Sequence, residues 1–235
     1  MKPPRIAAGY TGLAFAFLVA FAPSTRAATV ATDDASNYSS FGAFAASNLG
    51  TGFGSWTLVG DDGTTGNEGS YLNTTSKAIS ISTKAWGFYA NAGHIMEGRR
   101  AFTSALSAGQ VFQIDLESDG VDSGGSPHSP PPGSGTVKQF GFELRSGTTS
   151  RFRFYFRGGD SNCKYDDSAS GVDTATGGFP NDASGGFRVV FRLLTADTYE
   201  FTVVKGINGA VILYQRHANL GGHRRHDNRH GGLLR

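Results

Sequence analysis

Apolar and polar residues alternate strictly along four segments, which are residues 111–117, 138–145, 151–157 and 187–194. In the third of these, Phe152, Phe154 and Phe156 share one face, while three arginines and Tyr155 share the other. A period of two over this length predicts β-strands with one face in a core. No segment shows a convincing amphipathic-helix pattern, so these four segments set the expected fold class.

Two short turns join these segments into hairpins, at residues 146–150 and 195–197. The second turn leads into a further strand expected at residues 199–204. Matching the apolar faces predicts the cross-strand pairs Leu144–Phe152, Phe142–Phe154, Phe191–Phe201, Glu143–Arg153 and Arg192–Glu200. The last two would be favourable charge pairs on the outer faces. A shift of one residue in the strand pairing would expose the Phe rows to water, so we expect these registers to be strongly specified.

The rest of the chain adds shorter strands and long polar connections. The expected strands are residues 56–59, 78–82, 86–90 and 100–103, and the expected loops are residues 119–136 and 160–184. Many short strands with Gly-rich turns predict an all-β fold, an antiparallel β-sandwich of jelly-roll type. We expect it to form one domain over residues 28–215.

The first 27 residues have the order of a secretory signal peptide. Lys2 and Arg5 precede an apolar run over residues 6–22, and residues 25–27 offer small residues at the −3 and −1 positions of a cleavage site. An N-terminal membrane anchor is the alternative, although the run is at the lower edge of spanning length. We therefore expect an exported protein, extracellular, periplasmic or at the cell surface, with no membrane association after cleavage.

Charge and cysteine content give no support for a nucleic-acid-binding protein or for an enzyme with a cysteine nucleophile. The formal net charge is +2, but it comes from basic residues in the leader and in the last twenty residues, so residues 28–215 are mildly acidic. Mild acidity fits a soluble exported protein and gives no argument for a nucleic-acid partner. Cys163 is the one cysteine, so no internal disulfide can form. It has no His or acidic partner at a spacing typical of a nucleophile.

The tail, residues 216–235, differs in composition from what precedes it. It is rich in Arg and His, and alternation stops after Tyr214. His223, His226 and His230 suggest a metal site, but no apolar anchor would hold them in fixed geometry. A basic nucleic-acid tail is a second reading. A frameshift is the third, because a neighbouring frame of the back-translated tail reads as a turn followed by a β-strand. The favoured expectation is a disordered, non-native tail.

Several segments resemble a group of exported bacterial proteins, many of which carry a C-terminal PEP-CTERM sorting signal. The matching segments are residues 52–58, 86–91, 105–112, 121–125, 154–160 and 195–201. The resemblance implies a lectin-like, concanavalin-like sandwich in an exported protein of a mostly uncharacterised group. It carries over no site residue, and the chain departs from the group at its tail.

Residues 113–117 resemble the Glu-x-Asp-x-Glu strand of laminarinase-type glycoside hydrolases, which are also jelly rolls. In those enzymes alternate carboxylates on one strand face supply a nucleophile and a general acid. Asp115 and Glu117 fit the pattern, but the nucleophile position is Gln113, which cannot attack. An ordinary strand with a polar outer face is the favoured interpretation, so no catalytic residue is assigned.

Two acidic loops are candidates for calcium, because calcium prefers oxygen ligands. One contains Asp61 and Asp62, and the other contains Asp166 and Asp167. Neither follows an EF-hand spacing, and solvated turn residues are the alternative. Phosphate-loop, nucleophile-elbow and His-Glu-x-x-His motifs are absent from the sequence, so no other cofactor is expected.

Aromatic residues among polar ones suggest a carbohydrate site. Tyr155 and Arg153 lie on the outer face of one predicted strand, and Trp86 and Tyr89 lie together on another. For Trp86, packing in a core is the stronger alternative to ligand stacking. We therefore expect a non-catalytic module that binds carbohydrate or a cell-surface glycan. A structural or surface-associated protein is the alternative, and a glycoside hydrolase is a weaker one.

Overall fold

The computed structural model describes residues 29, 31–40, 47–60, 66–91, 94–118, 121, 139–167, 174–180, 185–206 and 211–218. Within these ranges the chain forms twelve β-strands and one short 3-10 helix, and every pairing between named strands is antiparallel. The predicted all-β, antiparallel class is confirmed. The described residues contain no helix long and apolar enough to cross a membrane.

The elements are η1 (Ala35–Asn37), β1 (Thr57–Gly60), β2 (Glu68–Asn73), β3 (Ala85–Ala90), β4 (Met96–Arg99), β5 (Val111–Leu116), β6 (Gln139–Ser146), β7 (Thr149–Arg157), β8 (Asn162–Asp167), β9 (Thr174–Pro180), β10 (Phe187–Leu193), β11 (Thr198–Lys205) and β12 (Val211–Ala218). They group into two units. We call β5–β12 the large unit, and η1 with β1–β4 the N-terminal unit.

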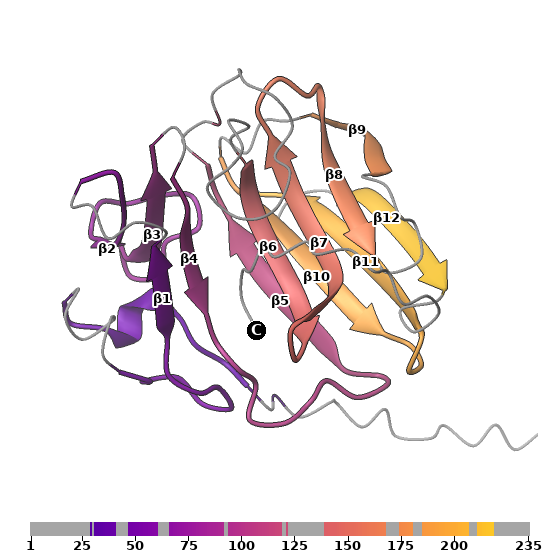
Figure 1. Ribbon diagram of the computed structural model, residues 1–235, viewed down its shortest axis with the longest axis horizontal. Helices are drawn as coiled ribbons and strands as arrows, with labels where there is room; N and C mark the ends of the chain where they lie inside the picture. Colours follow the sequence, from indigo (N-terminus) through magenta and orange to yellow (C-terminus); the bar gives the residue numbers. More distant parts are fainter. Residues whose placement is uncertain are drawn as a thin grey trace, which may run out of the picture.

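The large unit consists of two four-stranded sheets, in the orders β12-β11-β10-β5 and β6-β7-β8-β9. Figure 1 shows β6–β9 in front of β5, β10, β11 and β12, with β1–β4 beside them. The sheets meet through phenylalanines: the ring of Phe152 lies 5.1 Å from both Phe191 and Phe201. Phe156 lies 4.9 Å from Phe187. The apolar faces predicted from the alternation therefore face each other and form one core.

The predicted hairpin registers are confirmed, including all five cross-strand pairs. One interpretation of an outer face was wrong. Glu143 lies opposite Arg153, but its side chain is buried, and its carboxylate is paired with Arg145 at 2.9 Å. Burial is the largest cause that raises the pKa of Glu143, and nearby Glu97 adds to the rise. The outer face of β6 is thus not solvated at this position.

The N-terminal unit pairs β1 with β4 and β2 with β3. Its small core contains Tyr38 and Trp56, against which Trp86 and Phe88 pack. A buried ion pair between Asp33 and Arg100 ties the start of the described chain to this core. Tyr38 also donates to Asp33, at 2.6 Å. These contacts satisfy the buried charges, as burial requires.

Three expectations about secondary structure were wrong. Residues 78–82 form turns rather than a strand, because Ser82 and Thr83 adopt positive φ in a tight turn closed by Ile81 and Lys84. The strand expected at residues 100–103 lies earlier, as β4, and leaves one bridge between Phe53 and Phe102. The expected loop at residues 160–184 contains β8 and β9.

The C-terminal strand β12 runs to Ala218 and pairs Arg216 with Glu200 of β11. The first three residues of the expected tail therefore continue a strand. The remaining tail residues, 219–235, lie outside the described residues, as do the expected leader, residues 1–27, and the loop expected at residues 119–136 apart from Val121.

Candidate functional site

The hairpin of β2 and β3 carries the same motif on both strands. Gly69-Ser70-Tyr71-Leu72-Asn73 and Gly87-Phe88-Tyr89-Ala90-Asn91 both read Gly-x-Tyr-x-Asn. Antiparallel pairing places Gly69 opposite Tyr89, and Tyr71 opposite Gly87. Because directly paired residues share one side of a sheet, both tyrosines and both glycines lie on one face, which we call the tyrosine face.

Each tyrosine ring lies against the glycine of the opposite strand. A Cβ at Gly69 would come within 2.7 Å of the ring of Tyr89, and one at Gly87 would come closer still to the ring of Tyr71. The glycines are therefore needed for close approach. The two ring centroids lie 6.4 Å apart with their planes inclined by 46°. Both side chains stay accessible: Tyr71 is 40% exposed and Tyr89 is 44% exposed.

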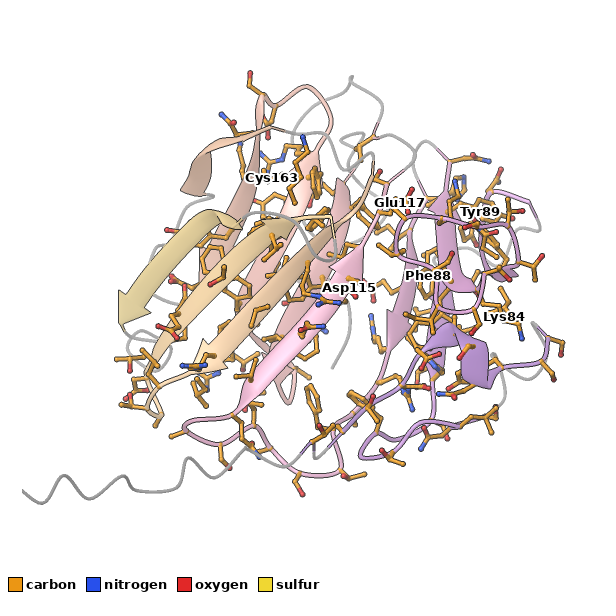
Figure 2. The ribbon with its side chains drawn as sticks, turned by 180° about the vertical axis from the view of Figure 1, so that it is seen from behind. Lys84, Phe88, Tyr89, Asp115, Glu117 and Cys163 are labelled. Atoms are coloured by element: carbon orange, nitrogen blue, oxygen red, sulfur yellow. The ribbon has the colours of Figure 1, made fainter. Side chains whose placement is uncertain are left out.

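The opposite face of the same hairpin is apolar and packed. Leu72, Trp86 and Phe88 contact the core of Tyr38 and Trp56. Trp86 lies 5.0 Å from Trp56 in an edge-on arrangement. Figure 2 labels Phe88 and Tyr89, which are neighbours in β3 and belong to these two different faces. Trp86 therefore packs in the N-terminal core, on the opposite side of the hairpin from Tyr89.

The positions around the two rings are uncharged. Asn73 ends β2 on the tyrosine face, and Asn67 and Asn91 extend the same face beyond the other end of the hairpin. The backbone N–H of Asn91 donates to the carbonyl of Asn67 at 2.7 Å. The side-chain oxygen of Asn73 accepts from the Thr75 N–H at 2.8 Å. The face thus combines two aromatic rings with carboxamides, which offer both donors and acceptors.

Tyr155 and Arg153, the other two expected ligand residues, lie together on β7. The ring of Tyr155 lies between the guanidinium groups of Arg153 and Arg157, at 5.3 and 5.6 Å. Tyr155 is buried, with 4% of its surface exposed, and Arg153 is ion-paired with Asp166 at 2.6 Å. The structure brings these two residues together but leaves little of the tyrosine ring accessible for stacking.

Asp166 and Asp167, expected as calcium ligands, point to opposite faces of β8. Asp166 pairs with Arg153, whereas Asp167 is buried and accepts a 2.5 Å hydrogen bond from the hydroxyl of Tyr199. Burial and this carboxylate raise the pKa of Tyr199. Because the two carboxylates point to opposite faces of the strand, they cannot bind the same ion. Asp61 and Asp62 lie outside the described residues.

Metal-ligating side chains do not gather elsewhere in the described ranges, where no group of three His, Cys, Asp or Glu residues is placed to hold an ion. His223, His226 and His230 lie outside those ranges. Cys163 faces the core of the large unit and is fully buried. Burial raises the pKa of its thiol, which keeps it in the unreactive protonated form.

The carboxylates of the hydrolase-like segment are occupied by partners. Asp115 accepts two hydrogen bonds from Arg188, at 2.7 and 2.8 Å, in a bidentate ion pair. Glu117 follows β5 and accepts from the backbone N–H of Ile79 at 3.3 Å. Figure 2 shows Asp115 on β5 of the large unit, away from Tyr89 of β3. This arrangement stabilises the sheet and leaves Gln113 where a nucleophile would be required.

Tyr71 was missed by the sequence reasoning, which named Tyr89 as a ligand candidate but not its neighbour across the hairpin. The signal that could have found it is the repeated Gly-x-Tyr-x-Asn pattern, because two such strands in antiparallel register set each tyrosine against a glycine. A comparison of the chain with protein-family models, with curated proteins and with solved structures found no match. The geometry of the described residues therefore carries the functional argument.

Proposed function

We propose that this protein is an exported, non-catalytic module that binds glycans through the tyrosine face. The observation that carries the proposal is the exposed pair of Tyr71 and Tyr89, each backed by a glycine. The leader pattern in residues 1–27 supports export, and the resemblance to exported PEP-CTERM proteins supports a concanavalin-like jelly-roll type. The two facing four-stranded sheets are compatible with that type.

Sugar recognition explains why two large rings are exposed on a strand surface. A pyranose ring presents an apolar C–H face and a rim of hydroxyls. The electron-rich face of a tyrosine attracts C–H groups, and its burial against the sugar removes apolar surface from water. The carboxamides of Asn73 and Asn91 match the hydroxyl rim, because Nδ2 of Asn73 can donate and Oδ1 of Asn91 can accept. Their other polar atoms bond to Thr75 and to the Gly66 carbonyl.

A hydrolase is disfavoured by the state of the candidate carboxylates. Asp115 is held by Arg188 in a bidentate pair, so both of its carboxylate oxygens are already engaged. A retaining mechanism needs a carboxylate nucleophile, and residue 113 is a glutamine. The exposed tyrosines and the occupied carboxylates together favour binding over catalysis.

The proposal is tested by binding of the mature chain to a panel of polysaccharides, with Tyr71→Ala, Tyr89→Ala and the double variant alongside. Each single variant should lose about tenfold in affinity, equivalent to about 1.4 kcal/mol. Val111→Ala is the matched control, because Val111 is equally exposed but lies on β5 of the large unit. Glycan binding that survives in the double variant would contradict the assigned site, and no binding to any glycan would favour a structural role.

Export is tested separately by fractionation of cells that express the full chain. We expect the protein outside the cytoplasm with a new N-terminus near residue 28, which N-terminal sequencing detects. Retention in the cytoplasm with Met1 intact would contradict export and leave the binding experiment unaffected.

A further inference from the structure

We infer that the ligand of the tyrosine face is an internal stretch of an uncharged polysaccharide, held by at least two of its sugar rings. This inference rests on the proposed glycan-binding function and names the class of glycan. It follows from four features of the N-terminal unit: the inclination of the two rings, the lack of charge on the face, the engagement of three cations elsewhere, and the exposure of both rings beside small residues.

The two tyrosines require two sugars. Their centroids lie 6.4 Å apart, and their planes are inclined by 46°. One flat pyranose cannot lie parallel to both rings at once, so each ring stacks on its own sugar. The inclination means that the two bound sugars differ in orientation, as they do along a polysaccharide that twists between successive residues.

The tyrosine face carries no formal charge. Its positions on the two strands are glycine, tyrosine, asparagine and alanine, because Glu68 belongs to the other face of β2. The carboxylate of Glu68 lies 3.4 Å from His94. A glycan with uronate, sulfate or phosphate groups would lose hydration there without gaining a charged partner, and burying an unpaired charge is costly.

Three described cations of the N-terminal unit are already engaged. Lys84, which immediately precedes β3, donates from Nζ to the carbonyl of Tyr38 at 2.6 Å. Arg99 is paired with Glu97, and Arg100 is buried against Asp33. Recruiting any of them to an anionic sugar would break an existing contact, and in the case of Arg100 a buried one.

The placement of the rings favours the middle of a chain over its end. Both tyrosines lie on strand surfaces with about two-fifths of each side chain exposed, 40% for Tyr71 and 44% for Tyr89. The described residues paired with them on the face are small or of medium size: Gly69 and Gly87 lie beneath the rings, and Asn73 ends β2. Among the described residues of this face, no side chain larger than asparagine stands beside the two rings, which suits a polysaccharide that continues past them.

The test compares how strongly the protein without residues 1–27 is retained on two sets of polysaccharides. The neutral set is β-glucan, xylan, mannan and starch, and the acidic set is polygalacturonate, alginate and hyaluronan. We expect retention on at least one neutral polymer, unchanged between low and high salt, and none on the acidic polymers. Retention on an acidic polymer that falls with added salt would overturn the inference and leave the proposed glycan binding intact. No retention on any polymer would overturn both.

A length series then tests the two-sugar requirement. For the neutral polymer that binds, affinity should rise up to about tenfold from the monosaccharide to the shortest oligomer that spans both rings. Tyr89→Ala should remove that rise, whereas Tyr89→Phe, which keeps the ring, should preserve it. A monosaccharide that binds as tightly as the oligomers would overturn the two-sugar inference even if the protein binds glycans.

Discussion

The two units use the same ingredient, aromatic residues on alternate positions of antiparallel strands, with opposite results. In the large unit the rows of Phe152 and Phe201 face each other and are fully buried. In the N-terminal unit one aromatic row packs around Trp56, while Tyr71 and Tyr89 on the other face remain exposed. The difference shows that the alternation alone determines a strand and its two faces, whereas the packing partner determines which face becomes a core.

The same contrast applies to glycine. Gly69 and Gly87 sit beneath tyrosine rings on the accessible face of the hairpin. Gly147 has φ of 61° and serves the turn between β6 and β7. The first kind of glycine creates room for a surface ring, and the second allows a tight hairpin. The comparison leads to predictions in which the two units respond differently to similar substitutions.

The largest effect is expected in the core of the large unit. Phe152→Ala removes a fully buried ring that contacts both sheets, and should lower the free energy of unfolding by about 3–5 kcal/mol. Tyr71→Ala, on the tyrosine face, should cost less than about 1 kcal/mol. Denaturant unfolding of both variants measures the difference, and equal losses would contradict the distinction between core and surface rings.

The next effect concerns the buried ion pair of the N-terminal unit. Asp33→Ala leaves the guanidinium of Arg100 buried without its carboxylate, and should cost about 3 kcal/mol or more. Arg192→Ala is the control, because Arg192 pairs with Glu200 at 3.4 Å but is exposed, and its loss should cost under about 1 kcal/mol. Similar losses in the two variants would show that the Asp33 pair is not shielded from water.

A smaller effect of opposite sign is expected in the turn before β3. Thr83 adopts φ of 67°, a left-handed conformation that costs a β-branched residue about 1 kcal/mol or more. Thr83→Gly should therefore raise the free energy of unfolding by about 1 kcal/mol. Thr75→Gly lies in the same connection without positive φ, and should bring no gain. A stabilised Thr75 variant would indicate that the effect does not come from the left-handed backbone.

The last and smallest effect is a change in how the free energy of unfolding depends on pH. Because burial raises the pKa of Glu143, its contribution to stability is fully present below the unfolded pKa of a glutamate and is lost as pH rises through the folded value. Glu143→Gln cannot ionise, so it should lose less stability than the native protein as pH rises from 4 to 7. Thermal unfolding of both proteins across that pH range measures the difference. If their stabilities change with pH in parallel, the raised pKa of Glu143 is contradicted.

Much of the large unit could be predicted from the sequence because its signals are local. The pairing of Phe142 with Phe154 followed from one short turn and two apolar rows. β8 was missed because Asp167 occupies an inward position, where its hydrogen bond to Tyr199 helps to make a carboxylate acceptable. The burial of Tyr155 could not be read from its strand, since the two flanking arginines suggest a solvated face.

The candidate site was harder to predict because it depends on a non-local pairing. Tyr89 stood out as an aromatic residue on a strand, but Tyr71 lies in a segment of mixed glycine, serine and asparagine that gave no strong strand signal. Only the register of β2 with β3 brings the two rings together. Whether Trp86 faces a ligand or a core likewise depended on Trp56, which comes from a different part of the chain.

Calorimetric titration of the protein without residues 1–27, with an oligosaccharide of whichever neutral polymer retains it, tests the central claim most directly. The account predicts saturable binding by the native protein and by Val111→Ala, and about a tenfold loss of affinity in Tyr71→Ala and in Tyr89→Ala with folding retained. Native-like binding by the variant that lacks both tyrosines would contradict the claim that the exposed face of β2 and β3 is the binding site.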